Sequence, residues 1–181
     1  MTHALITRRP TGRNACDAWG RLSLVVSLLT VGPAWAVCSV SSTGMSFGAY
    51  QPLLFSGKLT SADVLSTGTI AITCSAVLTL GSYTLALGPN TVGMGDGIST
   101  RYMANSSGGA NMMFNIYTDS NRSLVWGNGN LGSLISGSLP IITIGSQTQN
   151  VTVYGKIPAG QNNLKAGSYS GSMRMTLTYN P

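Results

Sequence analysis

Two cysteines, Cys38 and Cys74, are the residues whose type and spacing most directly suggest chemistry. The third cysteine, Cys16, and the single histidine, His3, both lie within the first 36 residues. If those residues are removed, two cysteines remain, and in an exported chain this even number predicts a disulfide between Cys38 and Cys74. The bond would close a loop of about 35 residues and stabilise the fold by roughly 3–4 kcal/mol. A metal site is disfavoured because two cysteines without a histidine provide too few ligands.

The first 36 residues have the composition of a secretory signal. Four arginines precede or flank an apolar run at 22–31, which is too short to span a bilayer comfortably. Ala34 and Ala36 flank Trp35 and form an A-x-A cleavage signature. We therefore expect residues 1–36 to be a signal peptide and residues 37–181 to be one exported domain without a membrane span. An N-terminal membrane anchor is the alternative, but no stop-transfer segment follows the apolar run.

Acid–base catalysis would have to use aspartate, because the chain after residue 36 contains neither histidine nor glutamate. Asp63, Asp96 and Asp119 are the carboxylic acids that remain, and a pair of them could in principle act as general acid and base. Asp119, however, lies in the segment YTDSN, which is typical of a turn at the end of a strand. We therefore expect no enzyme, no catalytic residue and no cofactor.

Net charge gives little support for nucleic-acid binding. The whole chain carries +6, but after residue 36 six Lys and Arg stand against three Asp, and six minus three leaves a net charge of +3. These cations are scattered and form no basic stripe. The glycine-rich loops are not followed by a helical pattern or a Gly-Lys-Ser/Thr motif, so nucleotide binding is disfavoured as well.

Strands, rather than helices, are predicted to position these residues. Apolar and polar residues alternate with a period of two in several short segments, and this pattern is typical of half-buried strands. The clearest segments are 69–74, 83–87, 112–117, 150–157 and 173–179. Turn-rich stretches lie between them at 88–97, 104–111 and 126–138. Many short strands with glycine-rich turns predict an all-β sandwich or barrel.

Several short motifs, taken in order, resemble the spore coat protein U domain family, which includes the subunits of archaic chaperone–usher pili. The motifs are Cys38, MSFGAYQP (45–52), GTIAITCS (68–75), YTLALG (83–88), RYMAN (101–105), MFNIYTDSNRSLVWGNG (113–129), VTVYGKIPAGQ (151–161) and GSYSGSMRMTLTY (167–179). The resemblance implies an immunoglobulin-like β-sandwich that lacks its final strand and is completed by a donor strand from a partner. A periplasmic chaperone is expected to supply this strand first, and another pilin subunit is expected to replace it at the outer-membrane usher.

The alternating segment at 173–179 is expected to lie at the edge of the incomplete sandwich. Its apolar residues Met173, Met175, Leu177 and Tyr179 would face the groove that the chaperone or donor strand fills. Burial of three or four such side chains would leave stabilisation on the order of 5–10 kcal/mol to be gained from a partner. The alternative from the pattern alone is that this segment is the last strand of a complete sandwich.

The predicted cleavage site bears on the place of the chain in an assembly. Fibre-forming members of the family carry a donor segment before the first cysteine, whereas cleavage after Ala36 would leave only Val37 before Cys38. The expected function is therefore a secreted structural subunit of a surface pilus, at its tip or terminus, that supports adhesion or biofilm formation. We expect export through the periplasm to the cell surface or the extracellular space.

Two other functions fit parts of the sequence. One is a stand-alone spore-coat or cell-surface protein with the same fold. The other is a carbohydrate-binding β-sandwich, in which an exposed Trp126 with Tyr102 or Tyr117 would stack on a sugar ring. Against the second function, Trp126 is the kind of residue that packs in a core or at a hairpin end.

Overall fold

The computed structural model describes residues 37–52, 61–75, 80–142 and 144–180. The predicted signal peptide, residues 1–36, and its cleavage residues Ala34 and Ala36 lie outside the described residues and stay predictions. The described part contains strands, turns and bends but no helix, as expected for an all-β fold. It accordingly offers no helix of the length and apolarity that a membrane crossing requires.

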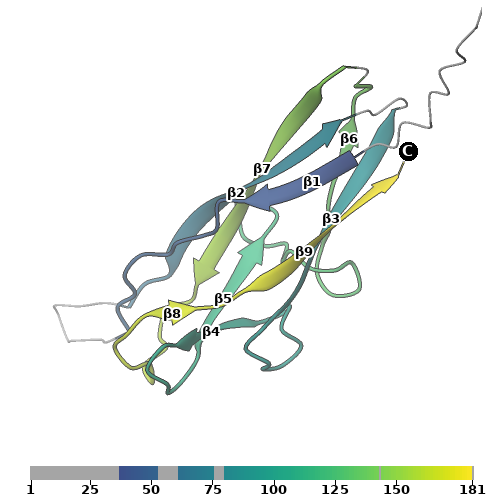
Figure 1. Cartoon of the computed structure of the whole chain (residues 1–181). Coiled ribbons are helices and arrows are strands. Elements are labelled where there is room, and N and C mark those ends of the chain that lie inside the picture. Colours follow the sequence, from purple (N-terminus) through teal and green to yellow (C-terminus); the bar gives the residue numbers. More distant parts are fainter. Residues whose placement is uncertain (1–36, 53–60, 76–79, 143, 181) are drawn as a thin grey trace, which may run out of the picture. The chain divides into compact units, whose positions relative to one another are not determined.

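Nine strands are formed by the described residues. They are β1 (Val37–Ser42), β2 (Val64–Ser75), β3 (Gly81–Asn90), β4 (Arg101–Asn105), β5 (Met112–Tyr117), β6 (Ile135–Leu139), β7 (Ser146–Ile157), β8 (Tyr169–Ser170) and β9 (Met173–Asn180). All the strand pairs are antiparallel. Figure 1 shows β1 and β9, which lie far apart in the sequence, as neighbouring edge strands of different sheets.

The strands form two sheets of unequal size. The larger sheet has the order β1-β2-β7-β5-β4-β8, and the smaller sheet has the order β6-β3-β9. The run β1-β2-β7-β5 follows the A-B-E-D order of an immunoglobulin domain, and β3-β9 follows the C-F order. The fold is therefore an immunoglobulin-like β-sandwich. The place of the final immunoglobulin strand, on the outer edge of β9, is not occupied by any described residue.

The five strands predicted from alternation are confirmed as β2, β3, β5, β7 and β9, although all of them except β5 extend beyond the predicted segments. Residues on the predicted inner faces are buried, as Ile72 and Leu85 illustrate. The alternation arises because successive side chains of a strand point to opposite faces of the sheet, and only one face meets the core.

The prediction of a turn over 126–138 is wrong at its end, because β6 begins at Ile135. This strand is built largely from serine, glycine and leucine, so its sequence resembles a loop. Its pairing with β3, from Gly81 opposite Leu139 to Leu85 opposite Ile135, determines its conformation. The short strands β1, β4 and β8 were likewise not distinguished by alternation.

Arg101 is an unusual member of the core because its side chain is fully buried, with 0% exposure. Its guanidinium donates hydrogen bonds to the carbonyl oxygens of Gly88 at 3.2 Å and Trp126 at 2.9 Å, and to Asn115 Oδ1 at 2.6 Å. Burial lowers the pKa of Arg101 to about 10, so the group remains a cation at neutral pH. Arg101 therefore ties the end of β3 to β5 and to the loop that carries Trp126.

Candidate functional site

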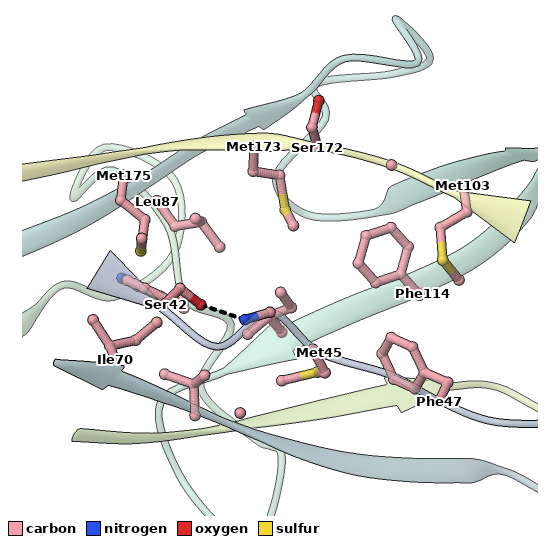
Figure 2. Close-up of a pocket in the computed structure, with 16 residues that line it drawn as sticks. Ser42, Met45, Phe47, Ile70, Leu87, Met103, Phe114, Ser172, Met173 and Met175 are labelled. Carbon is pink, nitrogen blue, oxygen red and sulfur yellow. Dashed lines mark hydrogen bonds between the residues drawn. The ribbon is translucent and has the colours of Figure 1, made fainter. Parts of the chain in front are cut away.

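An open pocket lies between the two sheets, where β1 ends and β9 begins. Its volume is about 270 Å³. Its lining comprises Ser42, Gly44, Met45, Phe47, Gly68, Ile70, Leu87, Met103, Phe114, Ile116, Trp126, Val153, Gly171, Ser172, Met173 and Met175. Figure 2 shows Met173 and Met175 pointing into the pocket from one side and Met45 pointing into it from the other. We refer to this pocket as the groove.

β9 forms one wall of the groove and contributes two of the four predicted residues. Met173 and Met175 line the groove, whereas Leu177 and Tyr179 lie on the same face of β9 but outside it. Leu177 and Tyr179 are half-buried against the core, opposite Leu85 and Tyr83 of β3. Beyond the groove β1 contacts β9, and Figure 1 shows the start of β1 near the end of β9. The groove thus extends along only the first part of the inward face of β9.

The opposite wall is formed by the segment 44–47, which follows β1 and is not itself a strand. Phe47 packs edge-to-face on Phe114, with the ring centroids 5.9 Å apart. Gly155 leaves the space that this segment occupies, because a Cβ at Gly155 would collide with Met45 and with the Phe47 ring. Gly68 has a similar role, since a Cβ there would lie 3.1 Å from the Gly44 carbonyl oxygen.

Hydrogen bonds fix this segment on the inner face of the larger sheet. The Ser66 hydroxyl donates to the Ser46 carbonyl oxygen at 2.5 Å, and the Gly44 N–H donates to Ser42 Oγ at 3.0 Å, the bond dashed in Figure 2. Further along, the Tyr50 hydroxyl donates to the Pro158 carbonyl oxygen at 3.0 Å. This segment was not predicted to line the groove, although its motif MSFGAYQP (45–52) is a signal that could have identified it.

A second pocket continues from the groove, and the two share Met45, Phe47 and Met103. It lies between the segments 45–52 and 164–169 and has a volume of about 730 Å³. Its lining is more polar and includes Tyr50 and Lys165. An extended ligand in the groove would therefore find further space at this end.

The predicted disulfide between Cys38 and Cys74 is confirmed. The two residues lie directly opposite each other in the β1–β2 pair. As an edge strand of the larger sheet, β1 pairs with β2 alone among the described residues. The disulfide adds a covalent attachment to the hydrogen bonds between these two strands. β1 is therefore held in its own sheet and is not free to move to another molecule.

Asp63, Asp96 and Asp119 all accept hydrogen bonds, Asp96 and Asp119 from their own loops and Asp63 from a distant segment. Asp96 accepts from the N–H groups of Ile98 and Ser99, both at 2.7 Å. Asp119 accepts from the Leu124 N–H at 2.8 Å, which confirms that YTDSN is a turn. Asp63 pairs with Lys156 at 2.6 Å and accepts from the Ala159 N–H at 2.9 Å. Among the described residues, no group of three or more His, Cys, Asp or Glu is placed to hold a metal ion.

These contacts lower the pKa of each carboxyl group and predict acid sensitivity. The leading causes are hydrogen bonds from Lys156 to Asp63, from Ser99 to Asp96 and from the Leu124 N–H to Asp119. A depressed pKa in the folded state gives stability that is present above the ordinary value of 3.8 and is lost as pH falls through the folded value. We expect the unfolding temperature to be level between about pH 7 and pH 5 and to fall below about pH 4.

Thermal unfolding followed by circular dichroism at a series of pH values measures this effect. In the matched variant Asp119→Asn, the unfolding temperature should be lower at pH 7 and the acid-induced decrease should be smaller. An unfolding temperature that rises on acidification from about pH 5 to about pH 3 would contradict the assignment.

Trp126 forms part of the floor of the groove and is not the exposed residue that sugar stacking would need. Only 1% of its surface is exposed. Its Nε1–H donates to the Leu85 carbonyl oxygen at 3.0 Å, and its backbone N–H donates to the Ile116 carbonyl oxygen at 2.8 Å. The carbohydrate-binding hypothesis was therefore wrong about Trp126, because this ring lies in the core where the two sheets meet.

Comparisons with known proteins point to one family. The profile of the Spore Coat Protein U domain matches residues 24–176. Protein U of Myxococcus xanthus is 31% identical over 155 residues, which cover 82% of this chain and 79% of that protein. Among solved structures, the CsuC–CsuE chaperone–tip adhesion subunit pre-assembly complex from archaic chaperone–usher Csu pili of Acinetobacter baumannii aligns with 21% identity and a TM-score of 0.45. That alignment covers 81% of this chain but only 40% of the solved chain.

Proposed function

The chain belongs to the Spore Coat Protein U domain family, and we propose that it is a secreted structural subunit of a chaperone–usher surface pilus. The observation that carries this proposal is the unpaired outer edge of β9 beside an open apolar groove. An unpaired edge presents backbone N–H and C=O groups that another strand can bind. The family resemblance implies that a partner supplies this strand.

The groove has the two features that strand addition requires. The outer edge of β9 offers main-chain hydrogen bonds, which give affinity for any extended segment. Every second side chain of the added strand would then enter the groove and contact Met173 and Met175 on one side and Met45 on the other. A periplasmic chaperone would provide the first strand. A neighbouring pilin subunit would replace it at the outer-membrane usher.

We further propose that this subunit accepts a strand but does not donate one. Cleavage after Ala36 would leave Val37 alone before Cys38, and Cys38 is held to Cys74 within the β1–β2 pair. A donor strand advances about 3.3 Å per residue and must extend over several residues to fill a groove. The subunit would therefore end an assembly, and a position at the pilus tip would place it where adhesion and biofilm contacts are made.

The N-terminus of the exported protein provides the test of this proposal. N-terminal sequencing is expected to begin at Val37, within about one residue. The purified protein is expected to remain without fibres by electron microscopy, and a periplasmic chaperone should co-purify with it when the two are produced together. Spontaneous fibres of this protein alone, or a mature N-terminus well before residue 22, would contradict the terminal position.

A stand-alone coat or cell-surface protein is the second candidate. The description of the matched family as a spore coat domain, and the similarity to Protein U, favour it. In that case the protein should be secreted at the same level whether or not a chaperone is present. A fall in its periplasmic level when the chaperone gene is deleted would favour the pilus subunit instead.

A further inference from the structure

Methionine is concentrated around the groove. Seven of the eight methionines follow residue 36. Four of these seven, Met45, Met103, Met173 and Met175, line the groove. Met45, Met173 and Met175 are half-buried, so solvent reaches them, whereas Met103 is only 9% exposed. The groove therefore presents three half-buried methionine side chains on its two walls.

We propose that Met45, Met173 and Met175 form an oxidation site whose state controls whether the groove accepts a strand. The inference rests on the proposed function, because it concerns the same groove. The oxidant is hydrogen peroxide. The sulfur atom attacks one oxygen of hydrogen peroxide, an S–O bond forms and the O–O bond breaks. The proton of the transferred OH group then passes to the departing hydroxide, which leaves as water. The thioether is oxidised by two electrons to the sulfoxide while the peroxide is reduced to water.

The chemistry of the groove explains why this oxidation would matter. Methionine is flexible and apolar, so its side chain adjusts to different strands that occupy the same groove. A sulfoxide is polar and needs hydrogen-bond donors when it is buried. Among the lining residues, Ser42 and Ser172 carry the hydroxyl groups, so two hydroxyl donors at most are available to three sulfoxides, and the Ser172 hydroxyl also shares a hydrogen bond with Thr91 Oγ1. The rest of the lining is apolar or glycine, apart from the Trp126 indole N–H, which is bonded to the Leu85 carbonyl oxygen, so a bound strand would leave at least one sulfoxide without a donor from the lining.

The same geometry predicts that a bound strand protects these methionines. A strand beside β9 would lie over Met173 and Met175 and opposite Met45, and would exclude peroxide from all three. Met94 and Met113 are 43% and 36% exposed and lie outside the groove. They serve as internal controls within the same molecule, because strand binding leaves their exposure unchanged.

Oxidation rates test the location of the site. The exported protein, with its disulfide intact, is treated with hydrogen peroxide, and each methionine is followed by peptide mass spectrometry. The probe is a synthetic peptide of roughly twelve residues with isoleucine at every second position and lysine or threonine between them. We expect the peptide to slow oxidation of Met45, Met173 and Met175 at least about fivefold and to leave Met94 and Met113 unaffected. Equal rates with and without a saturating peptide would overturn the inference.

The affinity for the same peptide tests whether oxidation weakens strand binding. Oxidised protein is expected to bind at least about tenfold more weakly than untreated protein. The variant Met45→Leu/Met173→Leu/Met175→Leu keeps the groove apolar without thioethers, so it should bind equally well before and after peroxide. An unchanged affinity of the oxidised natural chain, or an equal loss of affinity in the leucine variant, would overturn this inference and leave the proposed function unaffected. Failure of the untreated protein to bind the peptide would overturn the proposed function, and the inference with it.

Discussion

Replacement of Met175 or Leu177 by aspartate is expected to prevent the protein from accumulating in the periplasm. Both side chains lie on the inward face of β9, Met175 in the groove and Leu177 against the core next to it. An aspartate at either position would bring an ionised group into apolar surroundings without a partner, and burial of such a group costs several kcal/mol. The stability of a whole domain is only about 5–15 kcal/mol, and no described residue pairs with the outer edge of β9 to add to it.

Thr176 provides the matched control on the same strand, because it is exposed on the outward face between the two targets. The variant Thr176→Asp should accumulate at the level of the natural chain. Periplasmic protein is measured by immunoblotting, and bound chaperone is measured by co-purification. If Met175→Asp and Leu177→Asp both accumulate normally and retain the chaperone, β9 is not the edge at which assembly occurs.

The second large effect is expected from Trp126→Ala. The side chain is almost completely buried, and its removal should lower the free energy of unfolding by about 3–5 kcal/mol through the cavity that it leaves. The Leu85 carbonyl oxygen would also lose the hydrogen bond from the indole N–H. Because the same residue accepts from Arg101 through its own carbonyl oxygen, movement of the loop would disturb that buried cation as well.

Urea unfolding followed by fluorescence or circular dichroism measures this difference. Trp126→Phe keeps most of the apolar volume and loses the N–H, so it should cost less than the alanine variant. Leu124→Ala, at a neighbouring position where the side chain is 52% exposed, is expected to change stability by less than about 0.5 kcal/mol. A Trp126→Ala variant as stable as the natural chain would show that the ring does not hold the two sheets together.

Local pattern was sufficient for the strands that alternate and for the inward face of β9. In β9 every second residue is half-buried, and Met173 and Met175 line the groove as the pattern predicted. The even cysteine count likewise predicted the bond between Cys38 and Cys74. These features depend on the two-residue period of apolar side chains along a strand and on the types of residue, and both can be read directly from the sequence.

The wall of the groove opposite β9, formed by residues 44–47, could not be predicted from local alternation. The segment that carries Met45 and Phe47 has no regular structure, and its place depends on glycines at 68 and 155 that are far away in the sequence. Leu177 and Tyr179 share the inward face of β9 with Met173 and Met175 but do not line the pocket, and their place in a donor-strand groove stays a prediction. An inward-facing side chain is left exposed or covered by the segment that packs against it. That segment lies far away in the sequence, so local pattern does not identify it.

Residue types and local pattern were enough to predict short strands, a bond between two cysteines, and one apolar face for the strand at 173–179. Each of these follows from residue type and from a period of two, which act over a few neighbouring residues. Local pattern could not show that the outer edge of β9 is unpaired by any described residue, that Trp126 is 1% exposed in the core or that Arg101 is buried among carbonyl oxygens. Those outcomes depend on strand order and on packing between the sheets, because the free energy of burying a side chain is set by all the segments around it.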